Sequence, residues 1–333
     1  MILSLIILIL AVGLLLYILF GGADFGAGII EIFAGRHGKD TISNAIAPVW
    51  EANHVWLVLI VVILFMGFPP VYSTLLIGLH IPVLAALIGI ILRGTAFTFR
   101  HYDVVEDNTH KFYNLFFRLS SVITPFFLGV TTGAAILGRL NLQGDSFYSV
   151  FIAPWFNIFS ISMGLFTCAL FAWLAAVFLI GESRVEAFKK LYAKYAKAAL
   201  GITVILGAAV FGSAYLDGLD LISRFWSSKV SIGAFVLATM ALPLLWKTLN
   251  NLEAVRARFI VGAQVSLVIV GWFAIQFPVV INMSAGKSLT FYNTQAPEAT
   301  LLQLLKALIV GVLIILPSIF YLFKVFKFNQ NGN

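Results

Sequence analysis

Charged residues and cysteine are scarce in this chain of 333 residues. Asp, Glu, Lys and Arg together make up 11% of the sequence, whereas hydrophobic residues make up 61%. The single cysteine, Cys168, cannot form a disulfide within the chain, attach haem c covalently or supply the thiolates of an iron–sulfur cluster. So little charge beside so much apolar sequence excludes a soluble globular protein and indicates an integral membrane protein.

Several catalytic signatures are also missing from the sequence. It contains no P-loop, no Gly-rich nucleotide fingerprint and no His/Cys cluster with zinc-ligand spacing, so we predict no bound metal. The longest loops, residues 182–197 and 282–299, are too short to form a soluble catalytic domain. An ATP-driven pump or a dehydrogenase would therefore need another subunit, and any chemistry here is intramembrane or shared.

Long apolar runs dominate what is present. Nine of them are long enough to cross a hydrocarbon core, which takes about 20 helical residues, and none alternates like a strand. We predict an all-α polytopic membrane protein with nine transmembrane helices, arranged as two four-helix bundles and one peripheral helix. The runs cover approximately residues 2–22, 52–70, 73–99, 112–138, 152–181, 198–216, 229–246, 259–281 and 300–323. The predicted units are an N-terminal bundle (1–138), a second bundle (139–281), and a last segment with the outer loop, ninth helix and tail (282–333).

Basic residues in the loops predict the orientation. One side of the membrane would carry 14 Lys and Arg residues in loops and at helix ends, and the other side 4. Because cytoplasmic loops are enriched in Lys and Arg, the first side is predicted to be cytoplasmic, with the N-terminus outside and the C-terminus inside. The net charge of +7 then faces anionic lipid headgroups and requires no nucleic-acid partner.

Ionisable residues gather in the cytoplasmic half of the first predicted bundle. Each would cost about 2.5–3.5 kcal/mol at the membrane centre and less near its surface, so each needs a physical reason. This is the one polar cluster that draws on four predicted helices: Asp24, Glu31, Glu51, Asn53, His54, Arg93 and Arg118. On a helical wheel, Glu51 and His54 share one face and Asn53 and Trp56 another. The first face could carry protons, and the second could hold neighbouring helices.

The residues alone leave alternatives open. Glu51 can serve as a helix cap, since a carboxylate near a helix N-terminus is favoured by the dipole, or as a proton carrier. Arg93 can snorkel to the surface or pair with Glu51 or Asp24; we favour a pair because an unpaired charge is costly. His54 and His80 are haem ligands in principle, but a lone membrane histidine is more often hydrogen-bonded structure.

Three motifs mark the ends of the first three predicted helices: "GGADFGAG" closes the first, "APVWEANHVWL" opens the second, and "LRGTAFTFR" closes the third. In order and spacing they resemble subunit II of the cytochrome bd quinol oxidases. The first also has the small-residue spacing that lets helices approach closely, including Gly22 and Gly26. The positions that match the family pattern are Asp24, Trp50, Asn53, Val55, Trp56, Arg93, Phe97 and Arg100.

Three positions depart from that pattern. Gly21 stands where the family has a first acid, Glu51 replaces an aspartate, and Thr98 replaces a glutamate. Glutamate keeps the carboxylate and adds one methylene of reach, so proton transfer remains chemically feasible. The two missing acids place more weight on Glu51 and Asp24. The motifs cover residues 20–100 only, and the remaining helices agree in number rather than in sequence.

The resemblance implies a heterodimeric respiratory enzyme of the bacterial or archaeal cell membrane that oxidises quinol and reduces oxygen to water. Haem b and haem d would be held by subunit I, this chain would bind no cofactor, and a small third subunit is left open. A cytoplasmic proton path would use Glu51, with Asp24 and His54 beside it and Arg93 and Arg118 as charge partners. The rival readings are a proton-coupled secondary transporter, which typically shows inverted repeats and broken helices, and a purely structural partner subunit.

Overall fold

The computed structural model describes residues 1–47, 50–102, 109–284 and 286–325, and these are almost entirely helical. A π-helical turn, η1, joins the first two helices, and one small sheet pairs two antiparallel strands. The elements are α1 (Ile2–Leu16), η1 (Tyr17–Gly21), α2 (Gly22–Ile46), α3 (Trp50–Gly67), α4 (Pro69–Gly78), α5 (His80–Tyr102), α6 (Thr109–Leu137), α7 (Phe147–Phe151), α8 (Ile158–Glu182), α9 (Glu186–Leu216), α10 (Leu221–Ser227), α11 (Lys229–Met240), α12 (Leu242–Asn250), α13 (Ala254–Gln276), β1 (Val279–Ile281), β2 (Leu289–Thr290) and α14 (Glu298–Phe323).

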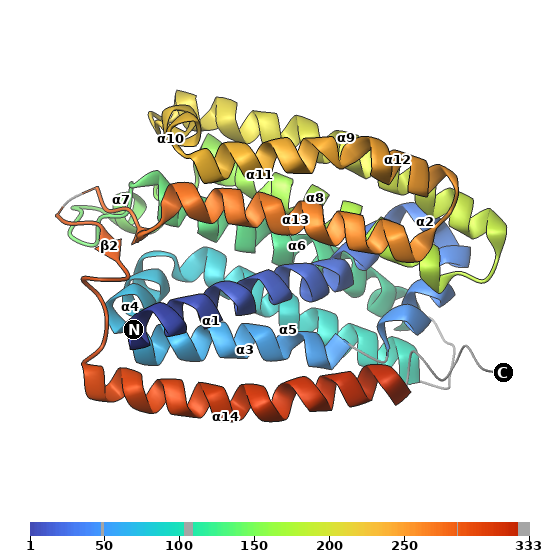
Figure 1. Cartoon of the computed structure of the whole chain (residues 1–333), viewed down its shortest axis with the longest axis horizontal. Coiled ribbons are helices and arrows are strands. Elements are labelled where there is room, and N and C mark those ends of the chain that lie inside the picture. The colour runs from blue at the N-terminus through green and yellow to red at the C-terminus, as the bar shows by residue number, and fades with distance from the viewer. Residues whose placement is uncertain (48–49, 103–108, 285, 326–333) are drawn as a thin grey trace.

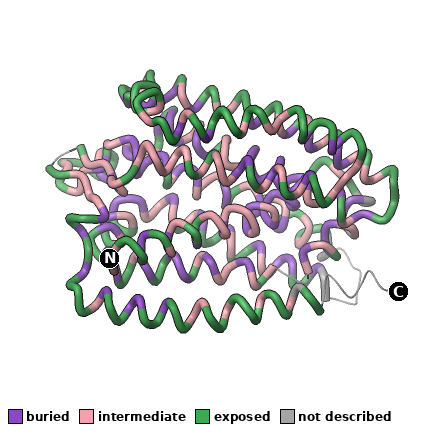
Figure 2. The backbone as a smooth tube through the Cα atoms, viewed as in Figure 1, coloured by how far each residue is buried: buried purple, intermediate pink, exposed green. Residues whose placement is uncertain are grey.

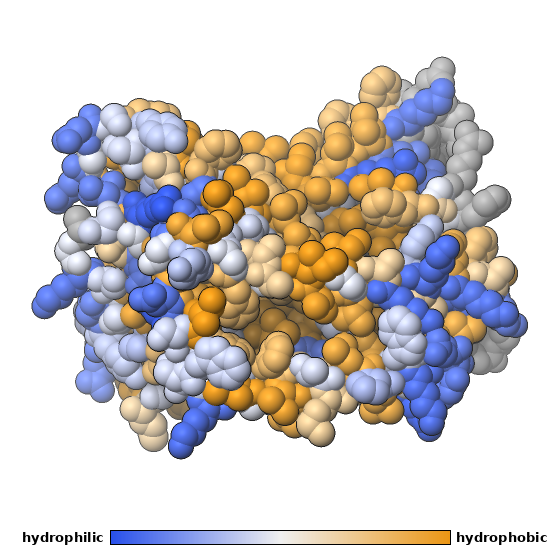
Figure 3. Space-filling model, turned by 90° about the horizontal axis from the view of Figure 1, so that it is seen from above, coloured by the Kyte–Doolittle hydropathy of each residue, from blue (hydrophilic) through white to orange (hydrophobic). Residues whose placement is uncertain are grey.

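The prediction of nine transmembrane helices is confirmed within the described residues. Long helices cross from one end of the molecule to the other, and α1 begins at the opposite end from the one where α14 finishes (Figure 1). Side chains on the view from above form an apolar band between two hydrophilic ends (Figure 3). This pattern is the one that a hydrocarbon core with water on both sides demands.

Three predicted boundaries were wrong. The sixth span begins at Glu186 rather than at residue 198, so most of the segment 182–197, which was predicted to be a loop, is helical. The first span does not close near residue 22: η1 leads directly into α2, and the helical path is broken only at Gly35, whose φ is 65°. The third span begins at His80 rather than at residue 73, because α4 occupies the chain after α3. Prolines at the start of α4 suit a first helical turn, so they begin this short helix instead of forming a simple turn.

Helix α8 lies at the centre of the molecule. Of its most apolar segment, 72% is buried, against 56% for α6 and less for the other spans. It packs against α2, α6, α9 and α13. Buried residues are accordingly concentrated in the interior, while the outer helices are largely exposed (Figure 2). The division into two four-helix bundles stays a prediction.

Glycines of the first motif let α2 approach α8 closely. A Cβ added at Gly26 would overlap the backbone carbonyl of Phe171, and one added at Gly22 would meet the Phe171 ring at 2.8 Å. A ring can turn aside, but a helix backbone cannot move without its neighbours. The small-residue spacing predicted for helix contact therefore has a defined partner, and Gly26 is its tightest position.

We expect Gly26→Ala to destabilise the protein, because α2 and α8 must separate to admit the new methyl group. A loss of about 1–3 kcal/mol, the range for overpacking a well-packed core, is expected in the free energy of unfolding. Gly201→Ala in α9 is the matched control, since nothing lies within 4 Å of the added Cβ there. Thermal unfolding of the purified protein in detergent measures both variants. Equal midpoints for the two would contradict the close packing.

Candidate functional site: a buried ion-pair cluster and an exposed glutamate

Asp24 and Arg93 form a two-pronged ion pair in the interior, joining α2 to α5. Arg93 Nη1 lies 2.6 Å from Asp24 Oδ2, and Arg93 Nη2 lies 2.8 Å from Asp24 Oδ1. Each side chain is 2% exposed. Of the two carboxylates that the sequence offered as partners for Arg93, the folded chain brings Asp24 to it. Bidentate geometry of this kind is the strongest form of a charge-assisted hydrogen bond.

Most of the N–H donors of the Arg93 guanidinium group have hydrogen-bond partners. Besides the carboxylate contacts, Nη2 donates to the Asp24 backbone oxygen at 2.8 Å and Nε donates to Ser121 Oγ at 3.2 Å. One donor on Nη1, two on Nη2 and one on Nε thus have partners, which is four of the five N–H groups. The Phe25 and Phe117 rings each lie 4.9 Å from the guanidinium carbon, in the range of cation–π contact. The sequence analysis did not predict Ser121, Phe25 or Phe117 as neighbours of Arg93.

A second buried pair lies further along the same two helices. Arg100 Nη1 lies 2.8 Å from both carboxylate oxygens of Glu31, and both side chains are fully buried. Arg118 of α6 joins them, with Nε 3.2 Å from Glu31 Oε1, although its side chain is 34% exposed. One carboxylate therefore holds two guanidinium groups. The sequence indicated Arg118 as a charge partner and Arg100 only as a motif residue.

A regular spacing underlies the two pairs. Asp24 and Glu31 are seven residues apart on α2, as are Arg93 and Arg100 on α5, so each arginine follows its carboxylate by 69 positions. Seven residues span almost two helical turns, so each set lies on one face of its helix. The two helices therefore run in the same direction with their charges aligned. This seven-residue match is a signal that could have paired Arg100 with Glu31.

Glu51 stands apart from these pairs. It is exposed in the first turn of α3, whereas Asn53 and Trp56 on the other face are 6% exposed each. Asn53 Nδ2 donates to the Phe20 carbonyl at 3.4 Å, which links α3 to η1. The helical-wheel expectation that Asn53 and Trp56 face neighbouring helices agrees with this burial. Trp50, one residue before Glu51, packs against the Phe97 ring with centroids 5.6 Å apart.

The two described membrane histidines make structural contacts. His54 is half-buried and meets Phe25 edge-on, with ring centroids 6.1 Å apart. His80 places Nδ1 2.9 Å from the Ile77 carbonyl and packs edge-on against Phe151. They come from different helices, and no group of three or more His, Cys, Asp or Glu suited to a metal occurs in the described part of the chain. The contacts described for both histidines are with residues of this chain.

Comparison with known proteins places this geometry in a family. A family model described as cytochrome bd terminal oxidase subunit II matches residues 2–326. Cytochrome bd ubiquinol oxidase subunit 2 of Bacillus subtilis (strain 168) is 25% identical over 302 residues, covering 90% of this chain and 86% of that protein. Cytochrome bd-I ubiquinol oxidase subunit 2 of Escherichia coli (strain K12) is 29% identical over 133 residues, covering 39% and 35%.

A solved structure agrees in fold. It is described as the structure of bd oxidase from Geobacillus thermodenitrificans, and the similar chain has a TM-score of 0.77 at 21% identity, covering 98% of this chain and 99% of that one. The matched family model extends far beyond the three motifs in residues 20–100, to nearly the whole sequence. The chain belongs to the family of cytochrome bd terminal oxidase subunit II.

Proposed function

We propose that this chain is the haem-free subunit II of a bd-type quinol:oxygen oxidoreductase, stabilising a haem-bearing subunit I and providing a cytoplasmic proton path to the oxygen-reduction site. Family membership supports the general assignment to a respiratory quinol oxidase complex with a subunit I partner. The proton path rests on one observation: Glu51 is the carboxylate of the family motif that remains accessible, while Asp24 and Glu31 are held by arginines.

A proton carrier must exchange its proton near the working pH. Asp24 is a poor carrier, because taking up a proton would neutralise its carboxylate. Arg93 would then be buried without a counter-ion. Glu51 has an exposed side chain in the first turn of α3, at the end of the bundle predicted to be cytoplasmic. It can take a proton from water and pass it toward a face shared with subunit I. His54 follows one turn later and is the second residue on that route.

The histidine contacts support placing haem b and haem d in subunit I. Haem supplies the oxygen and electron chemistry of the complex, and the residues of this chain contribute protein contacts and a proton entrance. Quinol is the proposed electron donor, and the orientation with the N-terminus outside follows the basic loops of the sequence. A small third subunit is compatible with this arrangement.

Co-purification tests the location of the haems. Expressed alone, the chain is expected to show no stoichiometric haem absorption, and co-expressed with subunit I it is expected to show reduced-minus-oxidised bands of haems b and d. Haem bound stoichiometrically to the isolated chain would place a cofactor here and overturn that part of the proposal. The same spectra test the alternative that the chain is a transporter, which predicts that no haem-bearing partner co-purifies. The alternative of a purely structural subunit is tested by substitution of Glu51, which should then leave turnover unchanged.

A further inference from the structure

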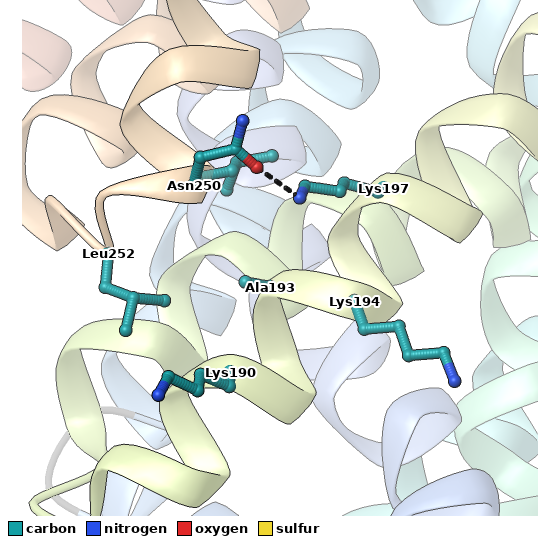
Figure 4. Close-up of a pocket in the computed structure, with 7 residues that line it drawn as sticks. Lys190, Ala193, Lys194, Lys197, Asn250 and Leu252 are labelled. Carbon is teal, nitrogen blue, oxygen red and sulfur yellow. Dashed lines mark hydrogen bonds between the residues drawn. The ribbon is translucent and has the colours of Figure 1, made fainter.

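A basic cavity lies at the end of the molecule predicted to be cytoplasmic, away from the ion-pair cluster. Its volume is about 220 Å³, and it lies between α9 and the end of α12. The residues that line it are Lys190, Ala193, Lys194, Lys197, Leu249, Asn250 and Leu252 (Figure 4). Three lysines, one asparagine and three apolar residues form this lining, which is the composition of a site for an anion with an apolar portion.

Lys197 is the positioned cation of this cavity. Its Nζ lies 2.6 Å from Asn250 Oδ1, and the ammonium lies 5.0 Å from the centre of the Trp246 ring. Figure 4 shows Lys197 reaching toward Asn250, with Lys190 on the side of Leu252 and Lys194 extending toward the other side. An ammonium has three N–H donors. Asn250 and the indole ring therefore fix its place and leave a donor for a ligand.

The net charge at the cavity stays positive when the carboxylate paired with one of its lysines is counted. Glu186 pairs with Lys190 at 2.7 Å, so the three lysines and this carboxylate sum to +2. Glu253, in the following turn, is engaged elsewhere: hydrogen bonds from Asn251 and then Arg256 hold the pKa of Glu253 below its ordinary value. Its charge is thus balanced by Arg256 rather than by the lysines of the cavity.

The helices that line the cavity, α9 and α12, also expose apolar residues suited to contact with acyl chains. Beyond Lys197, α9 exposes Ile202, Val204 and Ile205, and α12 exposes Leu244. Trp246 is 49% exposed at the same level as Lys197, as expected of an aromatic side chain at a membrane–water boundary. A lipid whose headgroup entered the cavity could therefore lay its tails along these helices.

We propose that this cavity binds the phosphate of an anionic membrane phospholipid, with Lys197 as the central contact and Lys190 and Lys194 at its rim. Basic pockets at the cytoplasmic ends of transmembrane helices are suited to anionic headgroups, and each lysine near such a surface strengthens binding about five-fold. Membrane lipid is favoured over free phosphate because the helices that line the cavity also expose apolar residues. The bound lipid would hold the N-terminal part of α9 against the turn between α12 and α13.

The test uses the purified complex with subunit I in detergent, titrated with phosphatidylglycerol and, separately, with phosphatidylcholine. Native mass spectrometry counts the bound lipids. Lys197→Gln is expected to weaken retention of the tightest phosphatidylglycerol about five-fold. Lys189→Gln is the matched control, because it removes the same charge from the same helix without lining the cavity. Lys197→Arg keeps the charge and should retain most of the binding.

Three results would overturn the proposal. Equal losses for Lys197→Gln and Lys189→Gln would reduce the lysines to a non-specific basic surface. Displacement of phosphatidylglycerol by millimolar inorganic phosphate, or equal retention of phosphatidylcholine, would exclude an anionic lipid as the preferred ligand. Yield and haem spectra of each complex identify a variant that fails to assemble, and in that case the Lys197→Arg complex and the wild type are compared at increasing salt.

Discussion

Glu51→Gln is expected to assemble with normal haem spectra and to lose most quinol oxidase turnover. Glutamine keeps the size and hydrogen bonding of the side chain but cannot carry a proton. Oxygen reduction consumes protons at a site inside the bilayer, so a relay is required on the way from water. The expected loss is on the order of 10²-fold, the lower end of what positioned acid–base groups contribute. Oxygen consumption with excess quinol measures it.

Two further variants make this result specific. Glu51→Asp restores the residue of the family pattern and should keep much of the turnover. Glu186→Gln is the matched control, because Glu186 is another exposed first-turn glutamate at the same predicted side. A carboxylate that only caps a helix contributes about 0.3–1 kcal/mol of stability and leaves turnover intact. Full turnover in an assembled Glu51→Gln complex would make Glu51 such a cap and direct attention to Asp24.

Arg93→Met is expected to produce the largest loss of stability. Removing one partner of a buried ion pair leaves the other charge uncompensated, which costs about 3–5 kcal/mol. Asp24 would then have to take up a proton or pull water into a site where its side chain is 2% exposed. The midpoint of thermal unfolding, followed by haem absorbance of the complex, should fall sharply, and the yield of complex should fall with it.

The double variant separates charge balance from function. Asp24→Leu with Arg93→Met replaces both charges by apolar groups, which is often neutral for stability, so much of the unfolding midpoint should return. Arg118→Gln is the control, since that arginine is 34% exposed and Arg100 keeps Glu31 paired. A double variant as unstable as Arg93→Met would contradict the pairing. A stable double variant without turnover would move Asp24 into the proton path.

The long apolar runs were sufficient to predict the number of spans, because few arrangements other than long helices satisfy backbone groups in lipid. The short helix α4 was missed because residues 69–78 are also apolar, so hydropathy merged them with the span that follows. The end of the first span was misplaced because a glycine-rich stretch suggests a break. Packing against α8 instead stabilises those glycines in a helix, and the break occurs at Gly35.

The site was predictable to the extent that buried charge needs a partner. That rule required a carboxylate for Arg93, but the choice between Asp24 and Glu51 depends on how α2, α3 and α5 are rotated about their axes. No local pattern fixes that rotation for α3. For α2 and α5 the matched spacing of seven residues does, and it also pairs Arg100 with Glu31. The aromatic neighbours of Arg93 depend on long-range packing and could not be predicted.

The central position of α8 has a consequence for biogenesis. Spans enter the membrane in chain order, and the ion pairs join α2 to α5 and α6, all of which precede α8. The buried charges can thus be neutralised while the chain is still being synthesised. The glycine face of α2, by contrast, stays open to lipid until α8 arrives from the ribosome. Ion pairing can therefore neutralise the buried charges of the first helices before α8 is inserted. Close packing of α2 against α8 follows later.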